Sequence, residues 1–179
     1  MSSHKFQDPK RSFLCYNKLM QWEKVTDIIL LTSFAVLAVF ACLGLYQLIT
    51  RKSLKKVDKS LLAFIPPMLL VAITYFIFDK IWIVSTRPDG SGEPSFPSTH
   101  TMAVATIFLC AMLALPRYVK QKSLRIILSI VMLILISITA TGRVLSDKHW
   151  PTDVICSLVF AIVYSGIYYL ISKQRTKNE

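Results

Sequence analysis

Apolar residues lie in five long runs along this chain, and short polar stretches separate the runs. The runs cover residues 28–50, 61–78, 101–115, 126–141 and 154–171. A helix rises about 1.5 Å per residue, so about 20 apolar residues cross the roughly 30 Å hydrocarbon core of a bilayer. The third run is short for a span, but a helix that begins at Ser98 recovers most of the missing length. The pattern predicts an all-α, polytopic transmembrane bundle of about five spans, forming one domain over residues 1–179.

The first 25 residues differ from the runs that follow. They mix five Lys or Arg side chains with several aromatic and aliphatic ones. This mixture predicts either an amphipathic helix lying in the membrane interface or a flexible segment with a few anchoring aromatic residues. Within the second run, Pro66 and Pro67 predict a kink, which a membrane helix tolerates where neighbours satisfy the freed carbonyls.

Composition and charge agree with a membrane protein. The chain is 54% hydrophobic and 17% charged, and its mean hydropathy is +0.52. Soluble domains contain about 25% charged residues. The net charge is +11, but the bases lie in short loops between apolar runs, where topology rules and anionic lipids favour them. We therefore expect membrane lipids and not nucleic acid as partners; the sequence predicts no oligomeric state.

The basic loops predict the orientation. Three segments are rich in Lys and Arg: residues 51–60 contain five, residues 117–125 contain four, and the C-terminal tail contains three. If all five runs cross the membrane, these three segments lie on the same side. Basic loops favour the cytoplasmic side. The bases of residues 1–25 fall on the opposite side and are the one disagreement. We expect an integral protein of a bacterial plasma membrane, with Trp82 and Trp150 at its outer interface.

Two polar patches fall at the non-cytoplasmic ends of the runs. The first polar patch is residues 80–100 and the second is residues 142–153. Together they contain cations, hydroxyls, imidazoles and a carboxylate: Lys80, Arg87, Ser98, Thr99, His100, Arg143, His149 and Asp153. Loops beside a rigid scaffold often carry function. We expect the two patches to meet in space and to hold a phosphate.

The cations and the start of the third helix suit an anionic ligand. Arginine forks match pairs of phosphate oxygens, and a lysine adds a point charge. Ser98 follows a proline where the helix should begin, so free backbone N–H groups and the helix dipole favour an anion there. Taken alone, this Pro-Ser pair would be read as an ordinary helix cap.

The second patch resembles an activated nucleophile. His149 and Asp153 are four residues apart, a spacing that places two side chains on one helix face. A carboxylate that accepts from one imidazole nitrogen leaves the other nitrogen free to attack. His100 is then the candidate acid for the leaving group. A zinc site on His100, His149 and Asp153 is the competing interpretation, but neighbouring cations would repel the metal unless phosphate bridged them.

These residues resemble the three signature motifs of the type-2 phosphatidic acid phosphatase superfamily. The motifs are Lys80-x6-Arg87-Pro88, Pro97-Ser98-Thr99-His100 and Arg143-x5-His149-x3-Asp153. The resemblance implies a metal-independent phosphatase, without a cofactor, that forms a phosphohistidine. It implies His149 as the nucleophile with Asp153 as its partner, and His100 as the acid. It also implies phosphate binding by Lys80, Arg87, Ser98, Thr99 and Arg143.

The sequence departs from the superfamily pattern at two positions. Thr99 stands where the second motif usually has glycine, so its side chain could crowd the phosphate or alter the approach of the backbone N–H. Gly142 stands where the third motif usually has serine, which removes a hydroxyl. Members of the lipid branch usually have six spans, whereas this sequence predicts five.

Our leading interpretation is a phosphatase of a lipid phosphate or diphosphate at the outer membrane face, with undecaprenyl diphosphate as the preferred substrate. Phosphatidylglycerophosphate, phosphatidic acid and the lipid A phosphates remain alternatives. A small anion carrier is the alternative from another class, although the apolar runs have no charged residue in their middles, where a transporter needs polar groups. A catalytically silent membrane scaffold is the third.

Overall fold

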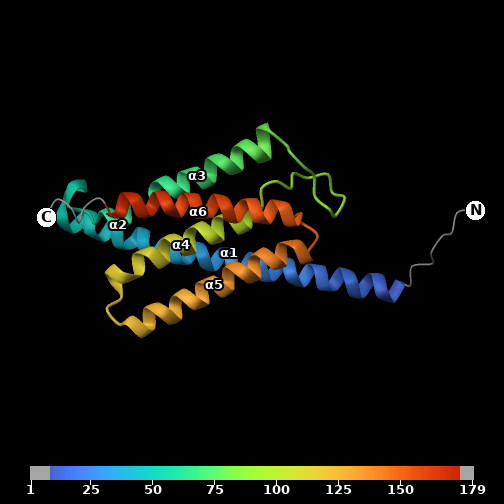
Figure 1. The fold of residues 1–179 in the computed structure, drawn as a ribbon, viewed down its shortest axis with the longest axis horizontal. Coiled ribbons are helices and arrows are strands. Elements are labelled where there is room, and N and C mark those ends of the chain that lie inside the picture. Colours follow the sequence, from blue (N-terminus) through green and yellow to red (C-terminus); the bar gives the residue numbers. More distant parts are fainter. Residues whose placement is uncertain (1–8, 174–179) are drawn as a thin grey trace, which may run out of the picture.

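The structure, a computed structural model, describes residues 9–173 and consists of helices joined by short connections and by one long loop at residues 82–98 (Figure 1). Within this range the only β pairing is an isolated bridge between Thr86 and Pro94. Among the described residues, five helical segments are long and apolar enough to cross a membrane. The predicted all-α bundle of five spans is therefore confirmed. The helices are α1 (Pro9–Arg51), α2 (Lys59–Leu62), α3 (Ile65–Phe76), α4 (Thr99–Tyr118), α5 (Lys122–Leu145) and α6 (Pro151–Lys173), with a 3-10 turn η1 (Leu54–Lys56) and a π-helical turn η2 (Ile77–Ile81).

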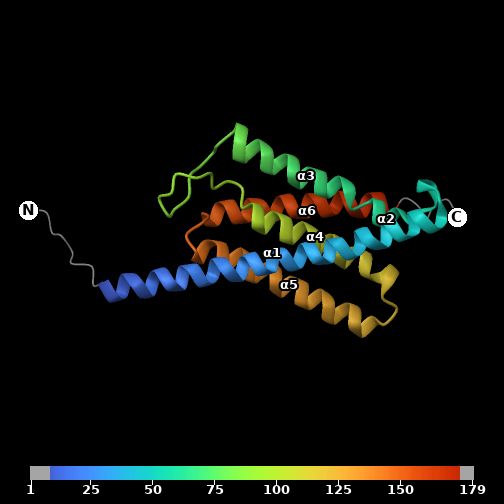
Figure 2. The same ribbon diagram turned by 180° about the vertical axis from the view of Figure 1, so that it is seen from behind.

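Helix α4 is the centre of the bundle. It contacts α1, α3, α5 and α6, and the two opposite views show it enclosed by them (Figures 1 and 2). In the most apolar stretch of α4, 67% of the residues are buried, a far larger share than in any other span among the described residues. Alanines at positions 103, 105, 111 and 114 are buried, and small residues let membrane helices approach closely. The outer helices expose aliphatic side chains such as Leu31, Ile127 and Ile162, as expected for lipid-facing surfaces.

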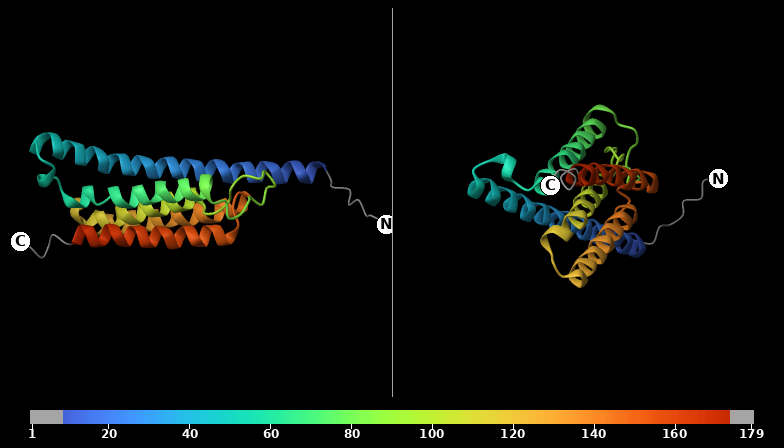
Figure 3. Two further views of the ribbon diagram at one scale, coloured as in Figure 1. Left: turned by 90° about the horizontal axis from the view of Figure 1, so that it is seen from above. Right: turned by 60° about the vertical axis from the view of Figure 1, so that its left-hand side comes forward.

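The N-terminal segment differs from our expectation. Helix α1 begins at Pro9 and continues without a break to Arg51, and its candidate span is Leu19–Arg51, so residues 9–25 continue the first helix. They form neither a flexible tail nor a separate interfacial helix. Between these ends the chain has no further proline, and Pro9 suits a first helical turn. The helix projects beyond the rest of the bundle (Figure 3). The predicted segment's first eight residues lie outside the described part of the chain.

The two prolines of the second run begin a helix instead of kinking one. Helix α2 ends at Leu62, and α3 starts at Ile65 with Pro66 and Pro67 in its first turn. Backbone N–H groups in a first turn have no partner within the helix, so proline costs nothing there. The second membrane-crossing segment is therefore two helices in succession.

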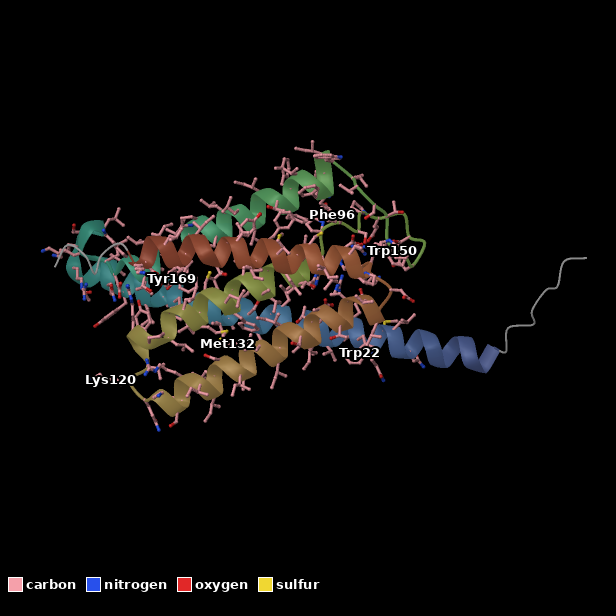
Figure 4. All side chains as sticks on the ribbon, in the orientation of Figure 1. Trp22, Phe96, Lys120, Met132, Trp150 and Tyr169 are labelled. Carbon is pink, nitrogen blue, oxygen red and sulfur yellow. The ribbon has the colours of Figure 1, made fainter. Side chains whose placement is uncertain are left out.

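The two ends of the bundle have different chemistry. Lys120 marks the end formed by η1, α2 and the α4–α5 connection, while Phe96 and Trp150 mark the opposite end (Figure 4). At the Lys120 end, Asp58 accepts hydrogen bonds from Arg117 Nη1 and Tyr118 Oη, each at 3.1 Å. The opposite end contains both polar patches.

Candidate functional site

The two polar patches meet, as the sequence predicts. The loop between η2 and α4 is tied to the turn between α5 and α6 by three contacts. The Asp89 N–H donates to the Asp147 carbonyl at 3.1 Å, Lys148 Nζ lies 3.4 Å from Asp89 Oδ2, and Trp150 Nε1 donates to the Thr86 carbonyl at 3.0 Å. The chemistry of the two motif-bearing loops is therefore combined in one site.

His149 is buried and held in one tautomer. Its Nδ1 donates to the Ser95 carbonyl at 2.7 Å, which leaves the lone pair on Nε2 facing Arg143 Nη2 at 3.3 Å. Burial, and then the positive charge of Arg143, lower the pKa of His149 to about 3. The ring is therefore neutral at physiological pH, and Nε2 carries the free electron pair that a nucleophile needs.

Asp153 supports His149 through Ser95, which corrects the direct contact that we expected. Asp153 Oδ2 accepts from the Ser95 hydroxyl and, at 3.0 Å, from the Trp150 N–H. The spacing argument required His149 to lie in the helix, but α6 begins at Pro151. The imidazole consequently turns to the Ser95 carbonyl, and the same serine connects it to the carboxylate.

Arg143 is a buried cation with an unused donor. It is 3% exposed, and its Nε has no hydrogen-bond partner among the residues described. Its Nη1 lies 3.5 Å from Thr26 Oγ1 and 3.9 Å from Asp27 Oδ1. Buried polar groups are almost always hydrogen-bonded. An unpaired N–H on a buried guanidinium therefore indicates a site for an anion.

The two cations of the first patch are placed differently. Arg87 is tied to the loop through its ion pair with Glu93 and through Nε, which donates to the Pro94 carbonyl at 3.3 Å. Its charge is one of those that lower the pKa of His149, so it belongs to the site. Lys80 has a 61% exposed side chain and pairs with Asp79 at 2.7 Å. The structure does not bring Lys80 to the other predicted phosphate ligands.

The second motif starts α4, as expected from the position of Ser98. Ser98 is fully buried, and its hydroxyl pairs with Thr101 Oγ1 at 3.0 Å without capping the helix. Thr99 is the first residue of α4, and His100 Nε2 lies 3.0 Å from Asp27 Oδ1. The first turn of α4 thus has no side-chain cap, and N–H groups at an uncapped helix start suit an anion.

An apolar groove leads from the site into the membrane-spanning region. Thr99 and His100 line one end of a cavity of about 440 Å³ between α1, α3 and α4. A second apolar cavity, of about 600 Å³, follows between α1, α2 and α3, and Leu37 and Met68 line both. The two apolar cavities are therefore neighbours along α1 and α3.

The three side chains that we weighed as zinc ligands do not converge. His100 contacts Asp27, while His149 and Asp153 are each bonded to Ser95. No group of three or more His, Cys, Asp or Glu in the described part of the chain is arranged to hold a metal ion. The geometry therefore favours an anion held by arginines and helix N–H groups over a zinc site.

Two residues of the site were missed by sequence reasoning. Ser95 lies in the first polar patch, but nothing in its spacing singled it out. Asp27 directly precedes the first apolar run, and a charged residue at the boundary of a span is the sequence feature that could have identified it as a site residue. Both were hidden because their roles depend on contacts between distant segments.

Comparisons with known proteins agree with the motifs and the fold. The chain is 34% identical over 86 residues to a lipid A 1-phosphatase of Porphyromonas gingivalis, a match that covers 48% of this chain and 18% of that protein. The chain also resembles the crystal structure of the first transmembrane PAP2 type phosphatidylglycerolphosphate phosphatase from Bacillus subtilis. That likeness has a TM-score of 0.60 at 18% identity and covers 97% of this chain and 90% of the other.

The family follows from a longer match. The sequence model of the PAP2 superfamily matches residues 74–177, more than half of the chain, and this range contains all three motifs. With the motif residues of both loops gathered at one end of a five-span bundle, the chain belongs to the PAP2 superfamily.

Proposed function

We propose that this protein is a metal-independent membrane phosphatase that removes phosphate from a lipid through a phosphohistidine on His149. One observation carries the proposal. The neutral Nε2 of a buried histidine lies beside a buried arginine with a spare donor, and His100 of the same site lines an apolar cavity. A nucleophile, an anion site and a path for a tail are the parts that a lipid phosphatase requires.

The reaction balances in two steps. In the first, His149 Nε2 attacks the terminal phosphorus, the bond from that phosphorus to the leaving oxygen breaks, and His100 gives that oxygen a proton. The leaving oxygen is the lipid oxygen of a monophosphate or the bridging oxygen of a diphosphate. In the second, water attacks phosphorus and returns a proton to His100, while the nitrogen–phosphorus bond breaks and inorganic phosphate leaves. Arg87, Arg143 and the first-turn N–H groups of α4 stabilise the charge on the phosphoryl oxygens throughout. Because the Lys80 side chain is exposed, we expect it to contribute least to stabilising this charge.

For the substrate we prefer undecaprenyl diphosphate. Two neighbouring apolar cavities of about 440 and 600 Å³ lie along α1 and α3, and a single long polyprenyl tail would use both. Lipid A phosphate is the second candidate, and the similarity to a lipid A 1-phosphatase supports it. Phosphatidylglycerophosphate and phosphatidic acid complete the set of lipid phosphates that the same chemistry would accept.

The purified protein tests this proposal directly. We expect phosphate release in detergent from at least one member of the four-lipid panel, undiminished by a chelator, because arginines and helix N–H groups supply the charge that a metal would supply. Vanadate should inhibit, since it mimics five-coordinate phosphorus. Loss of activity in chelator with recovery in a divalent metal would contradict the proposed chemistry. No release from any lipid, with anion flux in liposomes, would favour the carrier.

We further propose that the site faces away from the cytoplasm. The basic loops lie at the bundle end opposite to both patches (Figure 4), and such loops favour the cytoplasm. In a background with the four native cysteines replaced, Ser91→Cys should react with an impermeant thiol reagent on intact cells, while Ser53→Cys should not. Both should react after permeabilisation. The reverse pattern in intact cells would overturn the orientation and the preference for an outward-facing lipid.

A further inference from the structure

Helix α1 contributes a carboxylate to the site from outside all three motifs. Asp27 Oδ1 lies 3.0 Å from His100 Nε2 and 3.9 Å from Arg143 Nη1. Its side chain is 54% exposed, so it can exchange partners when a ligand arrives. Among the described residues, no other carboxylate contacts either of these two groups.

Close packing of α1 on α5 places this carboxylate. A Cβ on Gly142 would stand 2.7 Å from Thr26 Cγ2 and 3.3 Å from Trp22 Cε3. Only glycine leaves that space, and Thr26, which is buried, reaches Arg143 as a result. The departure from serine at position 142 therefore does more than remove a hydroxyl, because it lets α1 bring Asp27 to His100.

The charges that face His100 come from three other elements. Burial of the ring, and then the positive charges of Arg143 on α5 and Arg87 in the loop, oppose a positive charge on it, and His149 is neutral. Asp27 on α1 is the group that favours such a charge. An acid catalyst must carry a proton when the leaving group departs, and an adjacent carboxylate stabilises a protonated imidazole.

Resting on the proposed function, we propose that Asp27 is a positioning residue for the acid step. It accepts a hydrogen bond from His100 Nε2, fixes the ring, and stabilises the imidazolium that gives a proton to the departing lipid oxygen. In the imidazolium both ring nitrogens carry protons, so one remains bonded to Asp27 while the other is available for transfer. Asp27 touches neither phosphorus nor the lipid in this role.

The leaving group provides the test. Asp27→Asn in the full-length protein should reduce kcat on lipid phosphate by roughly 10- to 100-fold, a part of the 10²–10⁴ typical of acid–base catalysis. On nitrophenyl phosphate, whose leaving group departs without a proton, the loss should be under about threefold. KM should change little on either substrate, and Asp27→Glu should recover part of the lost lipid activity. In a His100→Ala background, Asp27→Asn should cause no further loss.

A matched control lies one turn earlier on the same helix. Glu23 pairs with Lys148 at 3.5 Å and has no contact with His100, so Glu23→Gln should keep the wild-type ratio between substrates. Equal losses on both substrates for Asp27→Asn, or full additivity with His100→Ala, would overturn the proposal. So would a gain in activity with a lower KM, which would show that Asp27 only competes with phosphate for Arg143. Inactive wild-type protein would instead reject the proposed function.

Discussion

His149→Ala should abolish turnover of both lipid phosphate and nitrophenyl phosphate, whereas His100→Ala should lose most of its activity on lipid phosphate alone. This is the expected result if the two imidazoles have different roles. Without Nε2 of residue 149 no covalent intermediate forms, whatever the leaving group. Without the acid, a lipid alkoxide departs poorly, but a nitrophenolate departs readily. The roughly 10²–10⁴-fold contribution typical of acid catalysis should therefore appear on one substrate only.

The measurement is steady-state kinetics on both substrates, together with trapping of phosphorylated protein after an acid quench that is followed by immediate neutralisation. Wild type and His100→Ala should accumulate label from nitrophenyl phosphate, and His149→Ala should accumulate none. The third histidine of the chain, His4, lies in neither patch, and His4→Ala is the matched control for general effects of histidine loss. Appreciable turnover by His149→Ala would place the nucleophile on another residue. Equal losses for both histidines on both substrates would contradict the division of labour.

The spans and the meeting of the patches could be predicted because their causes are local. Long apolar runs determine which segments cross a membrane, and a proline followed by Ser98 determines where α4 begins. An odd number of spans then places basic loops at one end and both patches at the other. The same reasoning fails for residues 9–25, because amphipathic composition alone does not reveal that α1 continues unbroken through them.

The finer geometry of the site depends on contacts that sequence spacing does not encode. A four-residue spacing predicted that Asp153 bonds His149, but α6 starts after the histidine, and Ser95 stands between them. In the sequence, Gly142 indicated only a missing hydroxyl. The structure shows that α1 packs closely against this glycine. Asp27 reaches His100 through that same contact. Each of these depends on tertiary packing between segments that are far apart in the chain.

Arg143→Met should have the second large effect, and it should act on both binding and protonation. Hydrogen bonds to charged groups contribute about 1.5–3 kcal/mol each, so losing a two-pronged contact to phosphate should reduce kcat/KM by roughly 10²–10⁴-fold. Arg143→Lys should also bind phosphate and vanadate poorly, because an ammonium cannot reproduce the fork. Replacement of Arg143 by methionine should not unfold the protein, because its acidic neighbour Asp27 has a 54% exposed side chain and is not left as a buried, unpaired charge.

The two variants should differ in their dependence on pH. In the wild type the pKa of His149, lowered to about 3, keeps the nucleophile neutral from pH 8 down to pH 5. Methionine removes the charge of Arg143 while burial, the larger cause of the low pKa, remains. The pKa of His149 should therefore rise by part of its shift, and protonation should withdraw the nucleophile at a higher pH than in the wild type. Lysine keeps the charge and the low pKa. Residual kcat/KM on nitrophenyl phosphate should therefore fall between pH 7 and pH 5 more steeply for Arg143→Met than for Arg143→Lys.

Histidine NMR of the detergent-solubilised protein checks the cause independently of activity. The chain has three histidines, so His4→Ala and His100→Ala assign the signals of His149 by elimination. The His149 ring should show no titration from pH 8 to pH 5 in the wild type and in Arg143→Lys, and the onset of titration in Arg143→Met. Gel filtration and thermal unfolding of each variant control for misfolding. If His149 titrated near its ordinary pKa in the wild type, neither burial nor Arg143 would be keeping the nucleophile neutral. The explanation of its low pKa by these two causes would then be wrong.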